Sequence, residues 1–487
     1  MGKKTSTFDY KTLASFLLPD GIFDFFDVTD VSEEHTGKYA ETGAEKIKLH
    51  IYLDERDTRS DEWHDLKPNG FTESREVTDF PVRDRKVILH VRRRRWIDSE
   101  GHNVVLNRYD LVASGTSYSK EFADVLKKYL DTYPVTARSV AQIYKIDGRQ
   151  LERAYKDCLS GFKDWDQVDH AAEWVLLPEN MGDCLSIDET LLHEDLRTFV
   201  SNKAGHGKHG TLVASVSGTK ASDVIKVLMQ IPEEKRLAVK EVTMDFSDSM
   251  YTIATKAFPN AEIVVDCFHI IKRCTDAVEE VRLREKREAI KEQNKQKTEH
   301  RKKLEKRAKR RKYYRKNHPK NYKGKKRGRK PMRLNQRFKP EELSNGDTHV
   351  ELLTRSRYLL TQSGDKWGEK QRERANLLFD MHPKIKEAYG HVCSLRAIFR
   401  DKSLNKETAR VKLHEWYQRV ANSNLREIKV ARDAIKYREE EVLNYFNNRS
   451  TNASAESLNS KTKGFRAQVR GVQDLPFFMY RVATIFG

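Results

Sequence analysis

The stretch of sequence that decides the fold runs from Cys184 to His269 and reads CLSIDETLLHEDLRTFVSNKAGHGKHGTLVASVSGTKASDVIKVLMQIPEEKRLAVKEVTMDFSDSMYTIATKAFPNAEIVVDCFH. Its pattern predicts three strands followed by two helix–strand units, which is typical of a mixed α/β sheet with an antiparallel meander at one side. The expected strands cover residues 184–188, 196–200, 211–216, 239–244 and 261–265, and the expected helices lie near 224–228 and at 249–258.

Carboxylates end two of these expected strands. Asp188 closes the first strand, and Asp245 follows the fourth. Because ligands of open α/β sheets bind beyond the carboxyl ends of strands, the two acids are placed to hold a divalent metal ion. Taken alone, either acid could be an ordinary helix cap, and Asp245 precedes a helix. Their places on the first and fourth strands favour the metal site, since this strand order is the one that the ribonuclease-H-like fold uses.

Three segments resemble the DDE transposases of bacterial insertion sequences, and the ISL-three family is the closest type. They are SIDET at 186–190, VTMDFSDSMYTIATKAFPNAEIVVDCFHIIKR at 242–273 and NNRSTNASAESLNSKTKGFRAQVRG at 447–471. The resemblance implies a ribonuclease-H-like core with the acidic triad Asp188, Asp245 and Glu456. It also implies a long helical insertion between the fifth strand and the helix that carries Glu456.

The chemistry implied by this resemblance is phosphoryl transfer on DNA with two Mg²⁺ ions, for which Mn²⁺ can substitute. Water would free a 3′-hydroxyl at the element end, and this hydroxyl would then attack target DNA. Asp266 and His269 follow the fifth expected strand. Asp266 competes with Asp245 for the role of second acid, but the family has that acid after strand four. His269 is a candidate to support the site or to contact DNA, and a buried histidine is the alternative.

The third acid stands near the beginning of the last expected core helix. Asn452 is expected to cap this helix, and Asn452, Glu456, Asn459 and Lys463 share one polar face at helical spacing. Without the resemblance, Glu456 would simply be an acid that offsets the helix dipole. The candidate phosphate contacts that follow it are Lys463, Arg466 and Arg470.

Residues 113–165 predict a helix-turn-helix, because two short helices flank the turn at Ile146–Gly148. The exposed part of the second helix would read DNA through Arg149, Gln150, Arg153 and Lys156. An ordinary helical hairpin is the alternative.

Residues 1–112 predict a small β-rich module that resembles the zinc-binding module of related transposases but lacks its cysteines. We expect it to be held by packing of Phe71, Phe80, Val87, Leu89 and Trp96. The run Arg92–Arg95 favours a phosphate contact, and a solvated strand edge is the alternative.

The net charge of +19 resides in one segment. Residues 281–340 hold 28 Lys and Arg against 5 Glu, which leaves −4 for the rest of the chain. The segment predicts a charged helix over Arg282–Arg315 and then a Gly/Pro/Lys loop over Asn317–Pro340. We expect it to be poorly ordered in the free protein and to order on DNA phosphates, as a solvated charge run would repel itself. Around Arg327 and Arg329 it resembles an AT-hook, which binds the minor groove.

Residues 341–444 predict an all-α insertion, in which Trp367 could stack on a base or pack in the core.

The bulk composition fits a DNA-bound protein of the bacterial cytoplasm. Hydrophobic residues make up 38% of the chain, which is enough for several cores, and five scattered cysteines exclude a disulfide scaffold. No apolar run reaches the length of a membrane span. The expected fold is multidomain α/β plus α, with a ribonuclease-H-like core interrupted by an all-α insertion. The expected domains are the β-rich module 1–112, the helix-turn-helix 113–165, the core 181–282, the insertion 283–444 and the final core helices 445–487.

The predicted function is that of an insertion-sequence transposase. Its partners would be double-stranded DNA, both terminal inverted repeats and target DNA, and other copies of the chain in a homo-oligomer on that DNA. Two alternatives stay open. One is a catalytically silent DNA-binding protein of transposon descent, and the other is a ribonuclease-H-like nuclease that cuts without strand transfer.

Overall fold

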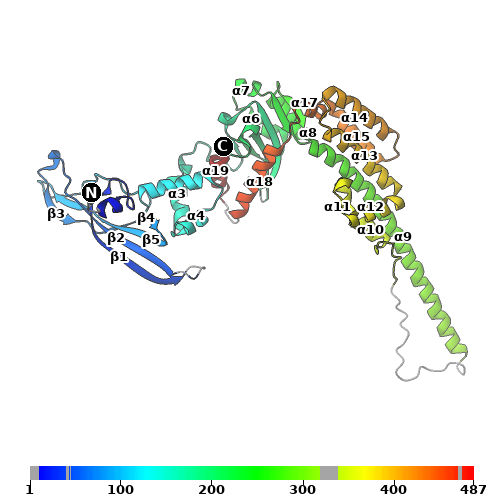
Figure 1. The fold of residues 1–487 in the computed structure, drawn as a ribbon, viewed down its shortest axis with the longest axis horizontal. Coiled ribbons are helices and arrows are strands. Elements are labelled where there is room, and N and C mark those ends of the chain that lie inside the picture. Colours follow the sequence, from blue (N-terminus) through cyan, green and yellow to red (C-terminus); the bar gives the residue numbers. More distant parts are fainter. Residues whose placement is uncertain (1–9, 40–42, 44, 193, 319–337, 470–473) are drawn as a thin grey trace, which may run out of the picture. The chain divides into compact units, whose positions relative to one another are not determined.

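The computed structural model describes residues 10–39, 43, 45–192, 194–318, 338–469 and 474–487 (Figure 1). The chain forms two compact units. The first consists of Met1–Val239, Lys256–Pro259 and Ala453–Gly487, and the second of Lys240–Thr255 and Asn260–Asn452. The fold is mixed α/β with several sheets and a large helical part, as expected.

The first unit begins with helices α1 (Tyr10–Ser15) and α2 (Ile22–Phe25) and a four-stranded sheet. Its strand order is β1 (Phe26–Tyr39), β2 (Glu45–Glu55), β5 (Arg85–Arg92) and β4 (Arg75–Val82), with β2 and β5 parallel. The alternation along β2 and β5 turns one apolar face inward, and Leu53, Val87 and Leu89 pack in its core.

The module contains a second, three-stranded sheet, in which β6 (Arg94–Ile97) pairs with β3 (Lys67–Phe71) and β7 (Asn103–Val104). One expectation for this module is wrong. Phe80 does not belong to the module's core. Its ring lies 4.8 Å from that of Phe122 and packs with the helices that follow.

Three helices come next: α3 (Lys120–Thr132), α4 (Ala137–Ile143) and α5 (Gly148–Ala154). Each is capped by the side chain that precedes it, namely Ser119, Thr136 and Asp147. The C-terminal helix α19 (Leu475–Phe486) packs against them through Phe477 and Tyr480. Its other face joins the following sheet, so α19 is buried on both sides.

That sheet contains β9 (Cys184–Leu192), β10 (Asp195–Asn202), β11 (Leu212–Ser217) and β8 (Trp174–Leu176), joined in antiparallel pairs. The first expected strand is too short, because β9 continues past Asp188 to pair Leu192 with Asp195. Helices α6 (Ala221–Leu228) and α7 (Glu233–Leu237) follow β11.

Helix α18 (Ala453–Gln468) packs on β9 and β10. The loop before β11 approaches α18 so closely at Gly207 that an added Cβ would lie 2.7 Å from the Ser457 hydroxyl. With a φ of 72° as well, this position requires glycine.

The second unit begins with the parallel pair β12 (Glu241–Met244) and β13 (Glu262–Val265) and with α8 (Asp248–Ala257). Helix α9 (Cys267–Asn317) then runs for 51 residues, as the long helix of Figure 1. The helices that follow are α10 (His349–Arg355), α11 (Arg357–Thr361), α12 (Glu369–Met381), α13 (Pro383–Arg400), α14 (Lys406–Ala421), α15 (Arg426–Tyr437), α16 (Glu439–Leu443) and α17 (Tyr445–Asn448).

The charged helix expected over Arg282–Arg315 is present, because α9 continues without a break to Asn317, and the expectation of poor order is therefore wrong over 281–317. Lys, Arg, Glu and Gln are good helix formers, and the buried Val281 and Ala289 anchor the helix from which these turns propagate. The AT-hook-like residues Arg327 and Arg329 lie outside the described residues.

Candidate active site

Asp188 lies in the middle of β9 rather than at its end, and it is 8% exposed. The side-chain amide of Asn459, on α18, donates a hydrogen bond of 2.6 Å to Asp188 Oδ2. Asn459 is itself buried, and its Oδ1 has no hydrogen-bond partner in the described part of the chain. A charge-assisted bond of this kind fixes the orientation of the carboxylate.

Asp245 follows β12 directly, as predicted, and is three residues upstream of the first residue of α8. Its Oδ1 lies 3.1 Å from His269 Nε2 and accepts a bond of 3.0 Å from the side-chain amide of Asn452. His269 thus supports Asp245, which is one of the two roles expected for it.

Asp266 has a different environment from Asp245. It is buried at the start of α9, where its Oδ1 accepts the backbone N–H of Phe268 at 3.0 Å, so it caps the helix. The Asn452 backbone N–H lies 3.4 Å from the other carboxylate oxygen. Because its oxygens are occupied in this way, Asp266 is a weaker candidate for the second acid than Asp245.

Glu456 is exposed in the first turn of α18. It lies four residues after Asn452 and three before Asn459, so the three side chains belong to one helical face. The two asparagines are buried and carboxylate-bound, whereas Glu456 points to a solvated position. Among the described residues, no group of three or more His, Cys, Asp or Glu side chains is arranged around a metal position.

The cations after Glu456 have different surroundings. Lys463 is exposed, as a phosphate contact would require. The Arg466 guanidinium lies over the ring of Phe478, 5.0 Å from its centroid, so part of this side chain serves packing. Arg470 lies outside the described residues.

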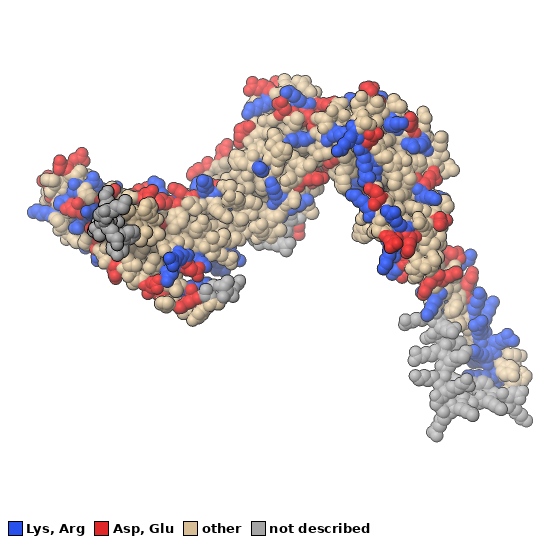
Figure 2. Space-filling view, viewed as in Figure 1, with Lys and Arg blue, Asp and Glu red and all other residues tan. Residues whose placement is uncertain are grey.

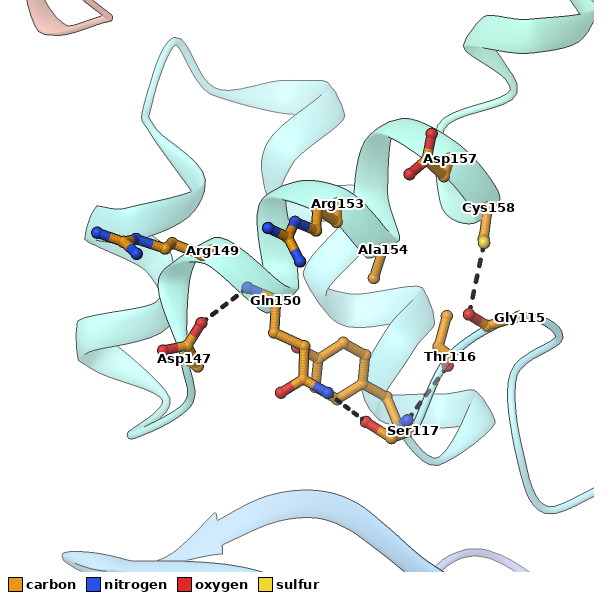
Figure 3. A pocket seen from close by; sticks show the side chains of 11 residues that line it. Gly115, Thr116, Ser117, Asp147, Arg149, Gln150, Arg153, Ala154, Asp157 and Cys158 are labelled. Carbon is orange, nitrogen blue, oxygen red and sulfur yellow. Dashed lines mark hydrogen bonds between the residues drawn. The ribbon is translucent and has the colours of Figure 1, made fainter.

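The expected DNA-reading helix is α5 with the turn that follows it. Arg149, Gln150 and Arg153 are exposed there beside a pocket of about 500 Å³ (Figure 3). The Gln150 side-chain amide donates to the Ser117 hydroxyl at 2.7 Å, which holds it against the preceding loop. Lys156 is not on this exposed face, contrary to expectation, because it forms an ion pair with Asp474 before α19.

The loop at residues 115–118 closes one side of this pocket, and sequence reasoning missed it. Tyr118 lines the pocket and is 1% exposed, and its hydroxyl has no hydrogen-bond partner among the described residues. Burial raises the pKa of Tyr118 to about 12, so the hydroxyl stays protonated and can donate at neutral pH. The Ser-Tyr-Ser sequence before α3 is the signal that could have indicated it.

In the arginine run of the N-terminal module, Arg95 is exposed, whereas Arg92, Arg93 and Arg94 make contacts within the protein. Arg92 bonds Asp54 at 2.6 Å, and Arg93 bonds the Tyr109 carbonyl at 2.7 Å and Glu55 at 3.4 Å. Arg94 donates to the backbone carbonyl of Glu55 at 2.7 Å. These contacts favour a structural role over the phosphate contact that we expected.

Trp367 packs within the helical part. Its ring is stacked on Tyr389 with centroids 5.3 Å apart, and its indole N–H donates to the Leu359 carbonyl at 3.0 Å. These contacts support core packing rather than base stacking.

The exposed part of α9 carries a dense positive charge. Residues 290–317 hold 14 Lys and Arg against 3 Glu, and Figure 2 shows these cations gathered along the far end of the helix. A surface of this kind matches the phosphates of a nucleic acid.

Comparison with known proteins agrees with these features. No curated protein matches the chain. Within the described residues, no helix has both the length and the apolar character of a membrane span. A family model for transposases of the ISL3 type matches residues 185–482. This match covers more than half of the chain and includes all three candidate acids. The chain therefore belongs to the ISL3-type DDE transposases, a family that acts on DNA and generally uses divalent metal ions.

Proposed function

We propose that this transposase binds the terminal inverted repeats of its element, cleaves the element ends and joins the freed 3′-hydroxyls to target DNA. It would act as a homo-oligomer on the DNA, through a ribonuclease-H-like core that carries Asp188, Asp245 and Glu456. The family supports the general role, and the amide contacts of Asp188 and Asp245 support the assignment of these two acids.

The observation that carries the proposal is that two asparagine side chains within residues 452–459 each donate a hydrogen bond to a candidate acid. Asn459 donates to Asp188 within the first unit, and Asn452 donates to Asp245 within the second. Glu456 stands between the two asparagines in the sequence. Each of the two aspartates is thus bonded by an amide from the segment that carries the third acid.

The donor atoms fit Mg²⁺, which prefers hard oxygen ligands. Three carboxylates are candidate ligands, and the unpartnered Asn459 Oδ1 is a further oxygen beside one of them. Asp188, Asp245 and Glu456 would hold two Mg²⁺ or Mn²⁺ ions, which when bound activate the attacking oxygen and stabilise the leaving one.

The protein's own side chains orient these ligands. Asn459 fixes the rotation of the Asp188 carboxylate, and Asn452 together with His269 fixes that of Asp245. Ligands fixed in advance need less reorganisation at the moment of reaction. No Ser or Tyr nucleophile is required, since water and then the DNA 3′-hydroxyl attack the phosphorus.

DNA binding is assigned to α4 and α5 as a helix-turn-helix, with Arg149 and Arg153 as the readers of bases. Gln150 would act mainly as a positioning residue, because its amide is bonded to Ser117. The exposed part of α9 and residues 319–337 would bind phosphates regardless of sequence.

The test is cleavage of DNA that bears the element's own ends, with Mg²⁺ or with EDTA. Asp188→Asn, Asp245→Asn and Glu456→Gln should each abolish cleavage and leave end binding intact, because each removes a metal ligand but no phosphate anchor. Asp266→Asn is the matched control, as asparagine can still cap α9. Normal cleavage by Asp245→Asn together with loss in Asp266→Asn would show that the second acid is misassigned.

The same assay separates the alternatives. A wild-type protein that binds the ends without cutting them would be a silent derivative. One that cuts but never joins a 3′-hydroxyl end to a target duplex would be a nuclease without strand transfer.

A further inference from the structure

A cleft lies between the N-terminal sheet and the turn that joins α4 to α5, and it has a volume of about 610 Å³. Five lysines line it: Lys38 on β1, Lys46 and Lys48 on β2, Lys86 on β5, and Lys145 in the turn. Three carboxylates also line it, so the net charge of its walls is positive.

The three carboxylates of the cleft are engaged within the protein. Glu34 binds Lys48 at 2.9 Å and His50 at 3.0 Å, Glu45 binds His35 at 3.1 Å, and Asp84 binds Lys145 at 2.8 Å. Glu34 and Asp84 are therefore paired with lysines, whereas Glu45 is bonded to a histidine, which is a cation only when protonated.

Lys38, Lys46 and Lys86 are the cations left over. In the part of the chain that the structure describes, no carboxylate lies within ion-pair distance of them. Lys86 is half-buried, and burial together with the neighbouring Lys48 lowers its pKa. The carboxylates of Glu76 and Asp147 oppose this lowering in part, and a bound anion would stabilise the ammonium further.

The sheet arranges these cations in a row. Lys46 and Lys48 occupy alternate positions of β2 and so project to the same side, and Lys86 is the register partner of Lys48 on β5. The row faces the α4–α5 turn, where Lys145 lies two residues before Asp147, the cap of α5. The cationic cleft is thus next to the helix assigned to reading the major groove.

We propose that this cleft holds the sugar–phosphate backbone of duplex DNA beside the groove that α5 enters. The inference rests on the proposed function and extends the DNA-binding surface to the N-terminal sheet. Backbone phosphates fit because the lysines form an extended row of point charges, which suits repeated anions, and because α5 would bring a duplex to this place. The contact would fix the position of the protein on DNA and would not depend on sequence.

The test compares the full-length wild type with a Lys46→Gln/Lys86→Gln variant. Binding is titrated from 50 to 200 mM salt on a duplex with the element's ends and on a random duplex. Each phosphate contact contributes about 0.9 to the slope of log K against log salt, so the variant should lose about 1.8 from that slope on both duplexes. Across this salt range, its affinity should fall roughly tenfold less than that of the wild type.

Two further variants keep the test decisive. Lys67→Gln/Lys128→Gln removes two exposed lysines of the same unit outside the cleft and should leave the slope unchanged. Lys46→Gln alone changes one exposed side chain and should lower the slope by about 0.9 even if the double variant does not fold.

The proposal would be overturned if the cleft variants showed the same slope of log K against log salt as the wild type. It would also be overturned if the control variant lost as much of that slope as the cleft variants. The first result is also expected if the cleft holds an acidic protein segment instead of DNA. Loss confined to the element ends would overturn it too, because backbone contacts carry no sequence information. If the wild type binds no duplex at all, the proposed function fails along with this inference. If the wild type binds, the salt slopes of the variants test the cleft contact separately from the proposed function.

Discussion

Replacement of Asn459 by alanine tests the proposed site while leaving all three candidate acids in place. The substitution removes the 2.6 Å bond that the side-chain amide donates to Asp188 Oδ2. It also removes the buried Asn459 Oδ1, which has no partner among the described residues. The carboxylate would keep its charge but lose one of the contacts that fix its rotation.

The expected magnitudes differ for activity and stability. A hydrogen bond to a charged group contributes about 1.5–3 kcal/mol. If catalysis depends on it fully, the cleavage rate falls by about 10- to 150-fold, since each 1.36 kcal/mol is a factor of ten. For stability, the lost bond is offset by removal of an unpartnered buried acceptor that costs about 1–3 kcal/mol. The melting temperature should therefore change little.

The assay is single-turnover cleavage of end-bearing DNA with Mg²⁺, with thermal melting measured in parallel. Asn447→Ala is the matched control, because it removes a 2.7 Å amide–carboxylate bond to Glu262 at an exposed position. A cleavage rate within twofold of wild type for Asn459→Ala, with Asp188→Asn inactive, would refute the orienting role. An equal loss in Asn447→Ala would also refute it.

Three further predictions concern other parts of the chain. Arg149→Ala should weaken end binding by about 1–3 kcal/mol with little effect on random DNA, whereas Lys156→Ala should lower the melting temperature instead. Neutralising Lys323–Lys330 should lower affinity for all duplexes alike and flatten the salt dependence, which salt titration measures. Burial raises the pKa of Asp347, but hydrogen bonds from two arginines outweigh this and lower it below its ordinary 3.8. Its stabilising effect is therefore complete above that pH and lost as the pH falls through the lowered value, so acid titration should bring wild type and Asp347→Asn to equal stability.

Local patterns predicted the secondary structure well where one face of an element is buried. The apolar face of α6 and the apolar run of β11 identified a helix and a strand that the structure contains. The end of β9 was missed because the residues after Asp188 are partly polar. What extends that strand is its pairing with β10, which no local pattern encodes.

The sequence by itself determined the types of the core elements, the acid that follows β12 and the concentration of positive charge near α9. These depend on neighbours a few residues apart. Only the tertiary structure decided which polar side chains form ion pairs or hydrogen bonds with residues far away in the sequence. Lys156 pairs with Asp474 across 318 residues, and Asp188 binds Asn459 across 271. Lys38, Lys46 and Lys86 of the cleft, in contrast, have no carboxylate within ion-pair distance in the described part of the chain. Such pairings depend on where the backbone brings distant side chains together and on how far it removes them from water.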